Sequence, residues 1–383
     1  MSCLCGQNEK QHLRNTTTIA LKSVFPSQRA WCLLVKRLNN SPGEYAMNTL
    51  WIDFLRANGA RFDQSLFADF GMPMDELRAT GRDTIITPLS HLAVLRFSGD
   101  DAKTFLHNQV TSDINHLDAD SVQLSGWCSA KGRMLASFQI FRDSDGYCAI
   151  LAEDLAEVTQ QGMKKYILRS RVTIENVSDR HTLLGLCGKE SLRLLESAHL
   201  PFPPASGRTM SFAHGCVIRL ADDRIVICCD NPQEIWSALV PPVRPVGSVC
   251  WRWLDVQAGL PLIVAATREA FVPQMVDFDK IGGVSFHKGC YPGQEVVART
   301  HYLGKVKRHL YRVHSTSAMV PGTLLFSPDN PDHACGEIAN VAPSPTGGFD
   351  GLAVIQEDYA EAKDLGLGAI NGPGLTVTPI EYA

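Results

Sequence analysis

Apolar residues first recur at a regular spacing in the segment NTLWIDFLRANG, residues 48–59. Trp51, Phe54 and Leu55 are three and four positions apart, which is the spacing of one face of an α-helix. Asn48 is a favourable N-cap residue, and the Asn-Gly pair at the end is a typical helix stop. The pattern therefore predicts a helix at the start of the folded part of the chain.

After this helix, strand-like and helix-like segments alternate. The first block is predicted to contain strands at 91–99, 121–130, 134–143, 147–153 and 172–178 and helices at 100–110 and 154–170. The second block is predicted to contain strands at 181–188, 216–221 and 224–230 and helices at 190–200 and 232–239. A further helix is expected at 251–263. Strands and helices mixed in this way are typical of α+β or α/β proteins.

The pattern changes again from His309, where short strand-like runs alternate with turns. This alternation of short strands and turns predicts a small all-β module, either a barrel or a sandwich. We therefore expect three parts: a basic extension at 1–46, an α+β region at 47–304 whose second lobe spans about 181–245, and a C-terminal β module at 305–383.

Residues 1–46 differ in composition from the rest, with six Lys or Arg against Glu9 and Glu44. A basic, acid-poor segment is typical of a mitochondrial transit peptide. A disordered tail and a start codon placed too early explain the same composition, and we favour these two explanations.

The composition of the 383 residues is that of a globular protein, with 45% hydrophobic and 20% charged residues. A net charge of −4 gives no global attraction to nucleic acid, so such binding would need a local basic patch. The stretches 164–171 and 305–314 are basic, but runs of this kind are more often solvated faces. No apolar run reaches the 18 residues or more that a membrane span requires.

Twelve cysteines are scattered along the chain without a CxxC pair. This spacing favours a reduced, intracellular protein and supports neither a structural zinc site nor a self-contained iron–sulfur ligand set. One cysteine stands apart, in the segment KGCYPGQE at 288–295. Its two glycines and its proline predict a shaped turn rather than the interior of a helix or strand.

Two interpretations of Cys290 remain open at this level. Beside Lys288 and an exposed flank, its thiol could have a lowered pKa and act as a redox group or a ligand. Alternatively, Cys290 is a small buried apolar residue and the turn serves packing alone. Trp251 and Trp253, at the start of the predicted helix 251–263, offer flat surfaces for a heteroaromatic ligand, although at least one of them should belong to the core.

KGCYPGQEVVAR resembles the signature of the folate-binding YgfZ family, which includes mitochondrial iron–sulfur cluster assembly factors. That family belongs to the superfamily of the glycine-cleavage T-protein, an aminomethyltransferase. The resemblance extends from Pro88 to the C-terminus. It is carried in family order by FLHNQVTSDI (105–114), SAKGRMLASFQIFR (129–142), QAGLP (257–261) and FVPQMVDFDKIGGVSFHKGCYPGQE (271–295).

The resemblance implies an α+β fold of three lobes, a T-protein-like cloverleaf, around a channel that binds tetrahydrofolate or a derivative. The last lobe would be a C-terminal β-barrel module, and no stably bound metal is implied. Cys290 would be the functional thiol, with Lys288 lowering its pKa. The remaining implied residues are Trp251, Gln257, Arg299 and Leu92 in the folate site and Gly289, Tyr291, Gly293, Gln294 and Glu295 in the motif.

Three positions depart from the pattern of the relatives. Leu92 stands near the place where a second ligand-lining aromatic residue is expected, so stacking on both sides of the ligand is not implied. Gln257 stands where relatives commonly have a glutamate that binds the pterin, and a glutamine offers one acceptor oxygen and adds two donors. Pterin affinity should therefore be lower, unless another carboxylate compensates. Pro88 stands where the T-protein has an aspartate that is central to catalysis, and a proline cannot exchange a proton. Classical turnover is therefore not expected.

We expect a folate-binding protein that supports assembly or repair of iron–sulfur clusters and, through them, tRNA modification. One cysteine cannot hold a cluster alone, so a cluster shared at Cys290 would need ligands from a partner protein or from glutathione. Expected partners are iron–sulfur assembly or client proteins, with tRNA contacted only indirectly or weakly, in the cytoplasm or, given a transit peptide, in the mitochondrial matrix. The alternatives are a tetrahydrofolate-dependent one-carbon transferase and a protein that binds tRNA directly through 305–314.

Overall fold

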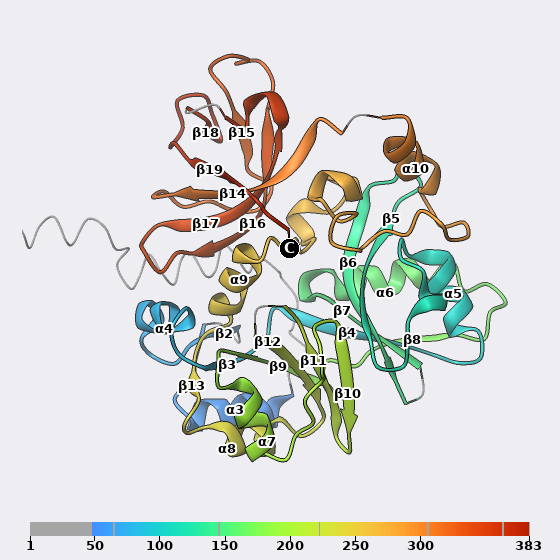
Figure 1. Cartoon of the computed structure of the whole chain (residues 1–383), viewed down its shortest axis with the longest axis vertical. Coiled ribbons are helices and arrows are strands. Elements are labelled where there is room, and N and C mark those ends of the chain that lie inside the picture. The colour runs from blue at the N-terminus through green and yellow to red at the C-terminus, as the bar shows by residue number, and fades with distance from the viewer. Residues whose placement is uncertain are drawn as a thin grey trace, which may run out of the picture.

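The computed structural model describes residues 48–63, 66–144, 146–221, 223–304, 306–361 and 364–382. The basic extension at 1–46 lies outside these residues. The described chain forms three large sheets and one small hairpin, of β1 (Arg61–Asp63) and β2 (Leu66–Asp69). Figure 1 shows the three sheets as three lobes around helix α9 (Ser248–Gln257), so the three-lobed α+β cloverleaf predicted from the sequence is confirmed.

The first sheet has five strands in the order β5-β6-β7-β4-β8. Its antiparallel strands are β4 (Leu92–Ser98), β5 (Val122–Cys128), β6 (Met134–Asp143), β7 (Gly146–Ala152) and β8 (Thr173–Asn176). The predicted hairpin is confirmed, because β5 pairs with β6 and Gly132 turns the chain with a φ of 69°.

The second sheet has six strands in the order β10-β11-β12-β9-β3-β13. These are β3 (Ile85–Pro88), β9 (Thr182–Cys187), β10 (Arg208–Phe212), β11 (Gly215–Arg219), β12 (Arg224–Cys229) and β13 (Arg244–Pro245). The sheet takes in β3, which precedes the segment 181–245 in the chain. Because β3 belongs to the second sheet and β4 to the first, the link 89–91 crosses from one lobe to the other.

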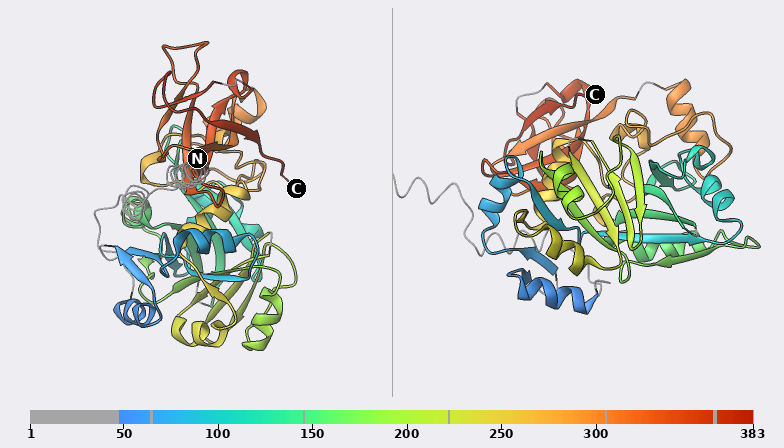
Figure 2. Two further views of the ribbon diagram at one scale, coloured as in Figure 1. Left: turned by 90° about the vertical axis from the view of Figure 1, so that its left-hand side faces the viewer. Right: turned by 60° about the horizontal axis from the view of Figure 1, so that its bottom comes forward.

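The C-terminal sheet has six strands in the order β18-β15-β16-β17-β14-β19. These are β14 (Arg308–Ser315), β15 (Leu324–Phe326), β16 (Gly336–Pro343), β17 (Phe349–Gln356), β18 (Gly366–Leu367) and β19 (Thr376–Pro379). An isolated bridge pairs Gly366 of β18 with Gly374, two residues before β19, and so links the two edges of this half-barrel sheet. Figure 2 places it at the opposite end of the molecule from the second sheet.

Eight α-helices lie in the described part of the chain. Besides α9 they are α3 (Thr49–Ala57), α4 (Pro73–Thr80), α5 (Ala102–Gln109), α6 (Ala156–Lys164), α7 (Ser191–Ser197), α8 (Pro232–Leu239) and α10 (Gln294–Tyr302). Short 3-10 helices occur at Ile114–His116, Glu153–Leu155, Ala265–Thr267, Pro273–Val276 and Glu357–Tyr359. None of the helices described here has the length and apolar character needed to cross a bilayer.

Local chemistry sets several helix ends. Asn48 caps α3 as predicted, since its side chain accepts a hydrogen bond of 2.9 Å from the backbone N–H of Leu50. The predicted helix 154–170 is too long, because α6 ends at Lys164 and Leu168 adopts a left-handed φ of 48° that a helix cannot include. The predicted helix 251–263 starts earlier and stops at Gln257, where Gly259 turns the chain with a φ of 64°.

Helix α9 lies where the cores of the lobes meet. Its Trp251 belongs to a core cluster shared by the first and second sheets, whereas its Val256 packs in a cluster that reaches residues of the C-terminal sheet. A helix buried on several sides in this way is held by tertiary packing rather than by its own propensity. Functional groups on α9 are therefore fixed relative to all three lobes.

Candidate functional site

A small hollow opens beside α9 between the first and second sheets. We call it the central hollow. Its lining combines aromatic rings, aliphatic side chains and a few polar groups, a mixture that is common in sites for small organic ligands. The residues that line it are Leu92, Leu124, Ser137, Phe138, Gln139, Ile150, Val226, Trp251, Asp255, Leu260, Pro261, Leu262 and Phe278.

Trp251 and Leu92, which the sequence assigns to the folate site, both line the central hollow. Trp251 is only 2% exposed, and its indole lies against Gly185 of β9. A Cβ at Gly185 would come within 2.4 Å of the indole, so this glycine makes room for the ring. The tryptophan is thus both a core residue and part of the wall of the hollow.

Asp255 brings a charge into the same hollow from one turn further along α9. It forms an ion pair with Arg224 of β12, with 2.7 Å between Asp255 Oδ1 and Arg224 Nη1. Burial raises the pKa of Asp255 to about 6, against the opposing effect of the guanidinium. The sequence analysis missed this residue, although its i, i+4 spacing from Trp251 could have placed both on one face.

Gln257 and Arg299 are not among the residues that line the central hollow. The amide of Gln257 points to the C-terminal sheet, where its Nε2 lies 3.5 Å from Asp350 Oδ2 of β17. Arg299 is exposed in the last turn of α10. The folate-binding roles expected for these two residues stay predictions, and neither is supported by the lining of the hollow.

Asp350 joins α9 to the C-terminal sheet. Its Oδ2 accepts a hydrogen bond of 2.8 Å from the indole N–H of Trp253, and its Oδ1 lies 2.7 Å from His314 Nδ1. Trp251 and Trp253 therefore face different partners, the first toward the hollow and the second toward Asp350. The sequence prediction that at least one of them serves the core agrees with this arrangement.

A second small hollow lies beside the link between β3 and β4. Pro88, Ser90 and Leu92 contribute to its wall, so Leu92 faces both hollows. Glu153 also lines it, and burial together with the nearby Asp154 raises the pKa of Glu153 to about 7. A carboxyl group thus lies near the position where Pro88 replaces an expected acid.

His91, next to Ser90, is enclosed rather than presented to the second hollow. It is 6% exposed, and neither ring nitrogen has a hydrogen-bond partner in the described structure. Burial, with a smaller contribution from Arg252, holds the pKa of His91 well below its ordinary value. The neutral, buried ring fits the structural role expected for it from the sequence.

Cys290 differs from the other cysteines in its exposure. Of the nine cysteines in the described residues, Cys290 is exposed and the other eight are buried. The interpretation that Cys290 is one more small buried residue is therefore wrong for this structure. Its neighbour Tyr291 is buried at 7% exposure, so the motif anchors itself through the tyrosine and leaves the thiol at the surface.

The motif loop is fitted to the turn between β5 and β6. Gly293 has a left-handed φ of 82° and caps α10, and a Cβ there would come within 2.4 Å of the carbonyl oxygen of Ser129. Only glycine combines this φ with so close an approach. The shaped turn predicted for 288–295 is confirmed up to Gly293, but Gln294 and Glu295 already form the first turn of α10.

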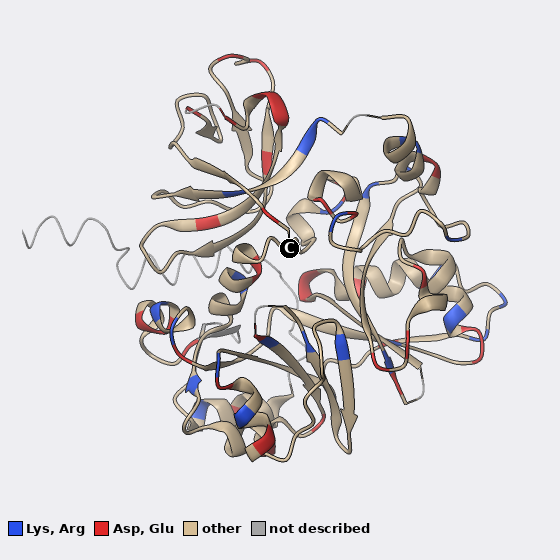
Figure 3. Ribbon diagram, viewed as in Figure 1, with Lys and Arg blue, Asp and Glu red and all other residues tan. Residues whose placement is uncertain are grey.

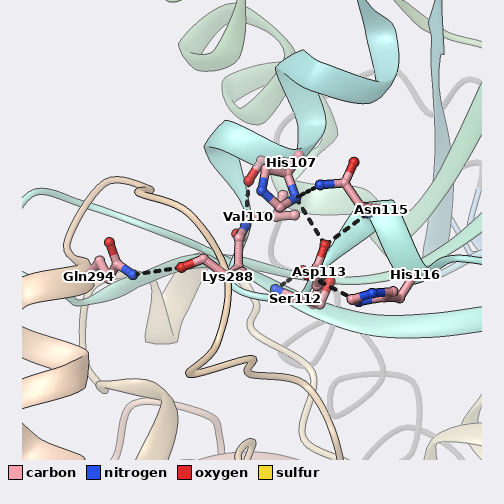
Figure 4. Close-up of polar contacts among 9 residues, drawn as sticks. His107, Val110, Ser112, Asp113, Asn115, His116, Lys288 and Gln294 are labelled. Carbon is pink, nitrogen blue, oxygen red and sulfur yellow. Dashed lines mark hydrogen bonds and ion pairs between the residues drawn. The ribbon is translucent and has the colours of Figure 1, made fainter.

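Lys288 anchors the loop to the end of α5 rather than pointing into solvent. Its ammonium group donates hydrogen bonds to the carbonyl oxygens of His107 and Val110, as Figure 4 shows. These are carbonyls that the end of a helix leaves without partners, and they attract a cation. Burial lowers the pKa of Lys288 to about 8. Its expected effect on the Cys290 thiol stays a prediction.

An imidazole and a carboxylate lie next to this anchor (Figure 4). His107 Nδ1 is 3.1 Å from Asp113 Oδ1, and the other carboxylate oxygen is 3.1 Å from His116 Nδ1. The Nε2 atom of His107 lies 3.4 Å from the place where Gly289 would carry a Cβ. Burial, and then the nearby Lys288 charge, lower the pKa of His107. His107 and Asp113 were not assigned from the sequence, although both lie in the FLHNQVTSDI segment.

Some cations of the two basic stretches are engaged within the fold. In 164–171, Arg171 Nη1 lies 2.9 Å from Asp100 Oδ2. In 305–314, Lys305 lies outside the described residues and Arg308 donates to the carbonyl oxygen of Ala334 at 3.4 Å. Figure 3 shows Lys and Arg interspersed with Asp and Glu over the three lobes.

The chain is similar in sequence to one known domain family and to several named proteins. Residues 54–227 match the GCVT N-terminal domain. The tRNA-modifying protein YgfZ of Vibrio vulnificus strain CMCP6 is 33% identical over 234 residues, 61% of this chain and 71% of the relative. The protein of the same name from Edwardsiella ictaluri is 31% identical over 255 residues, 65% of this chain and 76% of the relative.

The fold is also similar to that of a solved structure. The glycine cleavage system aminomethyltransferase T from Bartonella henselae superposes with a TM-score of 0.67 at 13% sequence identity, over 88% of this chain and 97% of that one. At this identity the likeness concerns the fold alone. Together with the sequence matches, it shows that the chain belongs to the YgfZ family, within the superfamily of the glycine-cleavage T-protein.

Proposed function

We propose that this protein binds tetrahydrofolate in the central hollow and supports tRNA modification through the assembly or repair of iron–sulfur clusters. The tRNA-modifying relatives and the aminomethyltransferase-like fold support the general role. The observation that carries the proposal is the pairing of a hollow lined by Trp251 with an exposed cysteine, Cys290, in the family motif.

The lining of the central hollow suits a pterin ring. Trp251 and Phe278 provide flat apolar surfaces, and Asp255 provides an acceptor for ring N–H groups. When bound, the folate supplies the chemistry of a one-carbon carrier. The residues of the chain bind the ring, orient it and exclude water from it.

Cys290 is the thiol that we assign to the cluster-related step. Among the described residues, no group of three or more His, Cys, Asp or Glu is arranged to hold a metal ion. A cluster ligated at Cys290 would therefore take further ligands from a partner protein or from glutathione. The iron–sulfur clients and the cytoplasmic location expected from the sequence belong to this proposal as well.

Genetic complementation tests the folate site and the functional thiol in one experiment. Cys290→Ala and Trp251→Ala would be expressed in a strain that lacks its own YgfZ relative, with activity of an iron–sulfur tRNA-modifying enzyme as the readout. We expect both variants to fail, whereas the control Tyr302→Ala, at an exposed position on α10, restores activity. Full activity of Cys290→Ala would refute the role of the thiol.

A one-carbon transferase is the second candidate, and the observation that favours it is Glu153. This carboxyl lines the second hollow with Ser90, where it could exchange a proton in place of the acid missing at Pro88. Steady-state turnover of an aminomethyl donor with tetrahydrofolate, abolished in Glu153→Gln, would support this function. Folate binding without turnover in the wild-type protein would exclude it.

A further inference from the structure

Asp255 lines the central hollow and has one carboxylate oxygen that accepts no hydrogen bond from the described residues. Its Oδ1 is bonded to Arg224, whereas no donor from the described residues bonds its Oδ2. The side chain is 16% exposed and Arg224 is 4% exposed, so most of the pair is enclosed while Asp255 lines the hollow. A carboxylate can accept about four hydrogen bonds. Asp255 is therefore an acceptor with spare capacity for a ligand.

Gln139 provides a second acceptor in the wall of the same hollow. Its side chain lines the central hollow, and its Oε1 is buried without a hydrogen-bond partner in the described structure. Buried polar atoms nearly always have a partner. An unpaired acceptor in the wall of a hollow is available to a ligand that brings donors of its own.

The rings of the hollow define the shape of such a ligand. Trp251, Phe138 and Phe278 line it together with aliphatic side chains. A flat heterocycle would pack against these rings while its polar edge met the acceptors. The edge that presents an N–H beside an NH₂ is that of a 2-amino-4-oxopyrimidine ring, which occurs in pterins and in guanine.

We propose that Asp255, and not Gln257, is the carboxylate that binds the donor edge of a 2-amino-4-oxopyrimidine ring in the central hollow. Arg224 holds this carboxylate in place, whereas the amide of Gln257 is directed to Asp350 of the C-terminal sheet. The inference rests on the proposed function, since it takes the pterin of tetrahydrofolate as the bound ring. It gives the chain a pterin-binding carboxylate although Gln257 stands where relatives commonly have a glutamate.

Equilibrium binding to the full-length protein tests the inference, with tetrahydrofolate and its 2-desamino analogue as a matched pair of ligands. Hydrogen bonds to charged groups contribute enough that we expect the wild-type protein to prefer tetrahydrofolate by at least about tenfold. In Asp255→Asn this preference should disappear. In Gln257→Ala it should remain.

The ligand pair separates failure of the inference from failure of the proposed function. Because Asp255→Asn leaves Arg224 buried without its partner, this variant could fold poorly, but the preference of the wild-type protein is measured without any substitution. Equal binding of both ligands by the wild-type protein would overturn the inference while folate binding stands. Binding of neither would overturn both. Binding of guanosine without tetrahydrofolate would keep the role of Asp255 and overturn the folate assignment.

Discussion

At the scale of single residues, exposure separates Cys290 from the other described cysteines. Burial raises the pKa of Cys128, Cys148 and Cys229 to about 12, so these thiols stay protonated near neutral pH. The thiolate is the reactive form, and it must also be reachable. A thiol at the surface, such as that of Cys290, can react with a partner molecule while the protein stays folded.

This contrast predicts the alkylation pattern of the native protein. In a brief treatment with iodoacetamide near neutral pH, Cys290 should be modified first among the nine described cysteines. The eight buried ones should react only after unfolding in denaturant. Peptide mapping by mass spectrometry gives the extent at each position, and early modification of a buried cysteine such as Cys250 would contradict the structure.

Glu153 leads to a prediction about stability and pH. Its pKa of about 7 in the folded protein exceeds the ordinary 4.5, so folding favours its protonated form. Above about pH 7 the carboxylate is ionised in both states, and its burial lowers the free energy of unfolding. Below about pH 4.5 the carboxyl is protonated in both states, and this cost disappears.

Glu153→Gln should therefore raise the free energy of unfolding at about pH 8, by on the order of 1–2 kcal/mol after allowance for partial solvent exposure. The gain should shrink as the pH falls toward about 5. Urea unfolding at both pH values measures it. Glu157→Gln, at an exposed position on α6, is the control that should change little. A gain that is independent of pH would show that the carboxylate is not the cause.

At the scale of elements, the motif loop depends on one backbone conformation. Gly293→Ala would require a left-handed φ of 82° for alanine and would place a Cβ 2.4 Å from a backbone oxygen. We expect a loss of about 2–4 kcal/mol in stability, or a displaced loop. Gly289→Ala is the matched control in the same motif, since its Cβ would meet only His107 Nε2, at 3.4 Å. Thermal melting compares them, and equal effects would refute the argument.

Most elements could be predicted from periodicity, but their contacts across the chain could not. The hairpin of β5 and β6 and the helix α3 follow from local patterns of apolar residues and turn residues. The shortness of α6 depends on the left-handed conformation of Leu168, which is not a residue that usually marks a turn. The Lys288 contacts with His107 and Val110 span 181 and 178 positions, and no local rule joins residues so far apart.

In the candidate site, too, the sequence predicted individual residues but not the contacts between distant ones. The motif and the resemblance predicted that Cys290, Trp251 and Leu92 are functional, and the structure places the last two in one hollow. Asp255 was not predicted because its partner Arg224 is on a strand of another lobe, 31 positions away. Gln257 occupies the sequence position where relatives commonly have a pterin-binding glutamate, yet its side chain is directed to Asp350. The direction of a side chain depends on packing that a motif does not record.

At the scale of the whole molecule, α9 connects the hollow to the C-terminal sheet through Asp350. This carboxylate, 17% exposed, accepts from the indole of Trp253 and pairs with His314. Hydrogen bonds to a charged group contribute about 1.5–3 kcal/mol each, and their loss would leave the indole N–H without its partner. The half-barrel should therefore stabilise the helix that carries Trp251 and Asp255.

Asp350→Ala should lower the free energy of unfolding by about 2–4 kcal/mol and also weaken tetrahydrofolate binding, although Asp350 does not line the central hollow. The reason is that α9 loses its fixed position before it loses its helical structure. Urea unfolding and equilibrium binding measure the two effects, with Asp358→Ala, exposed on the same module, as the control. Reduced stability with unchanged affinity would show that the hollow is held by the first two sheets alone, and that the C-terminal sheet serves another purpose than supporting the site.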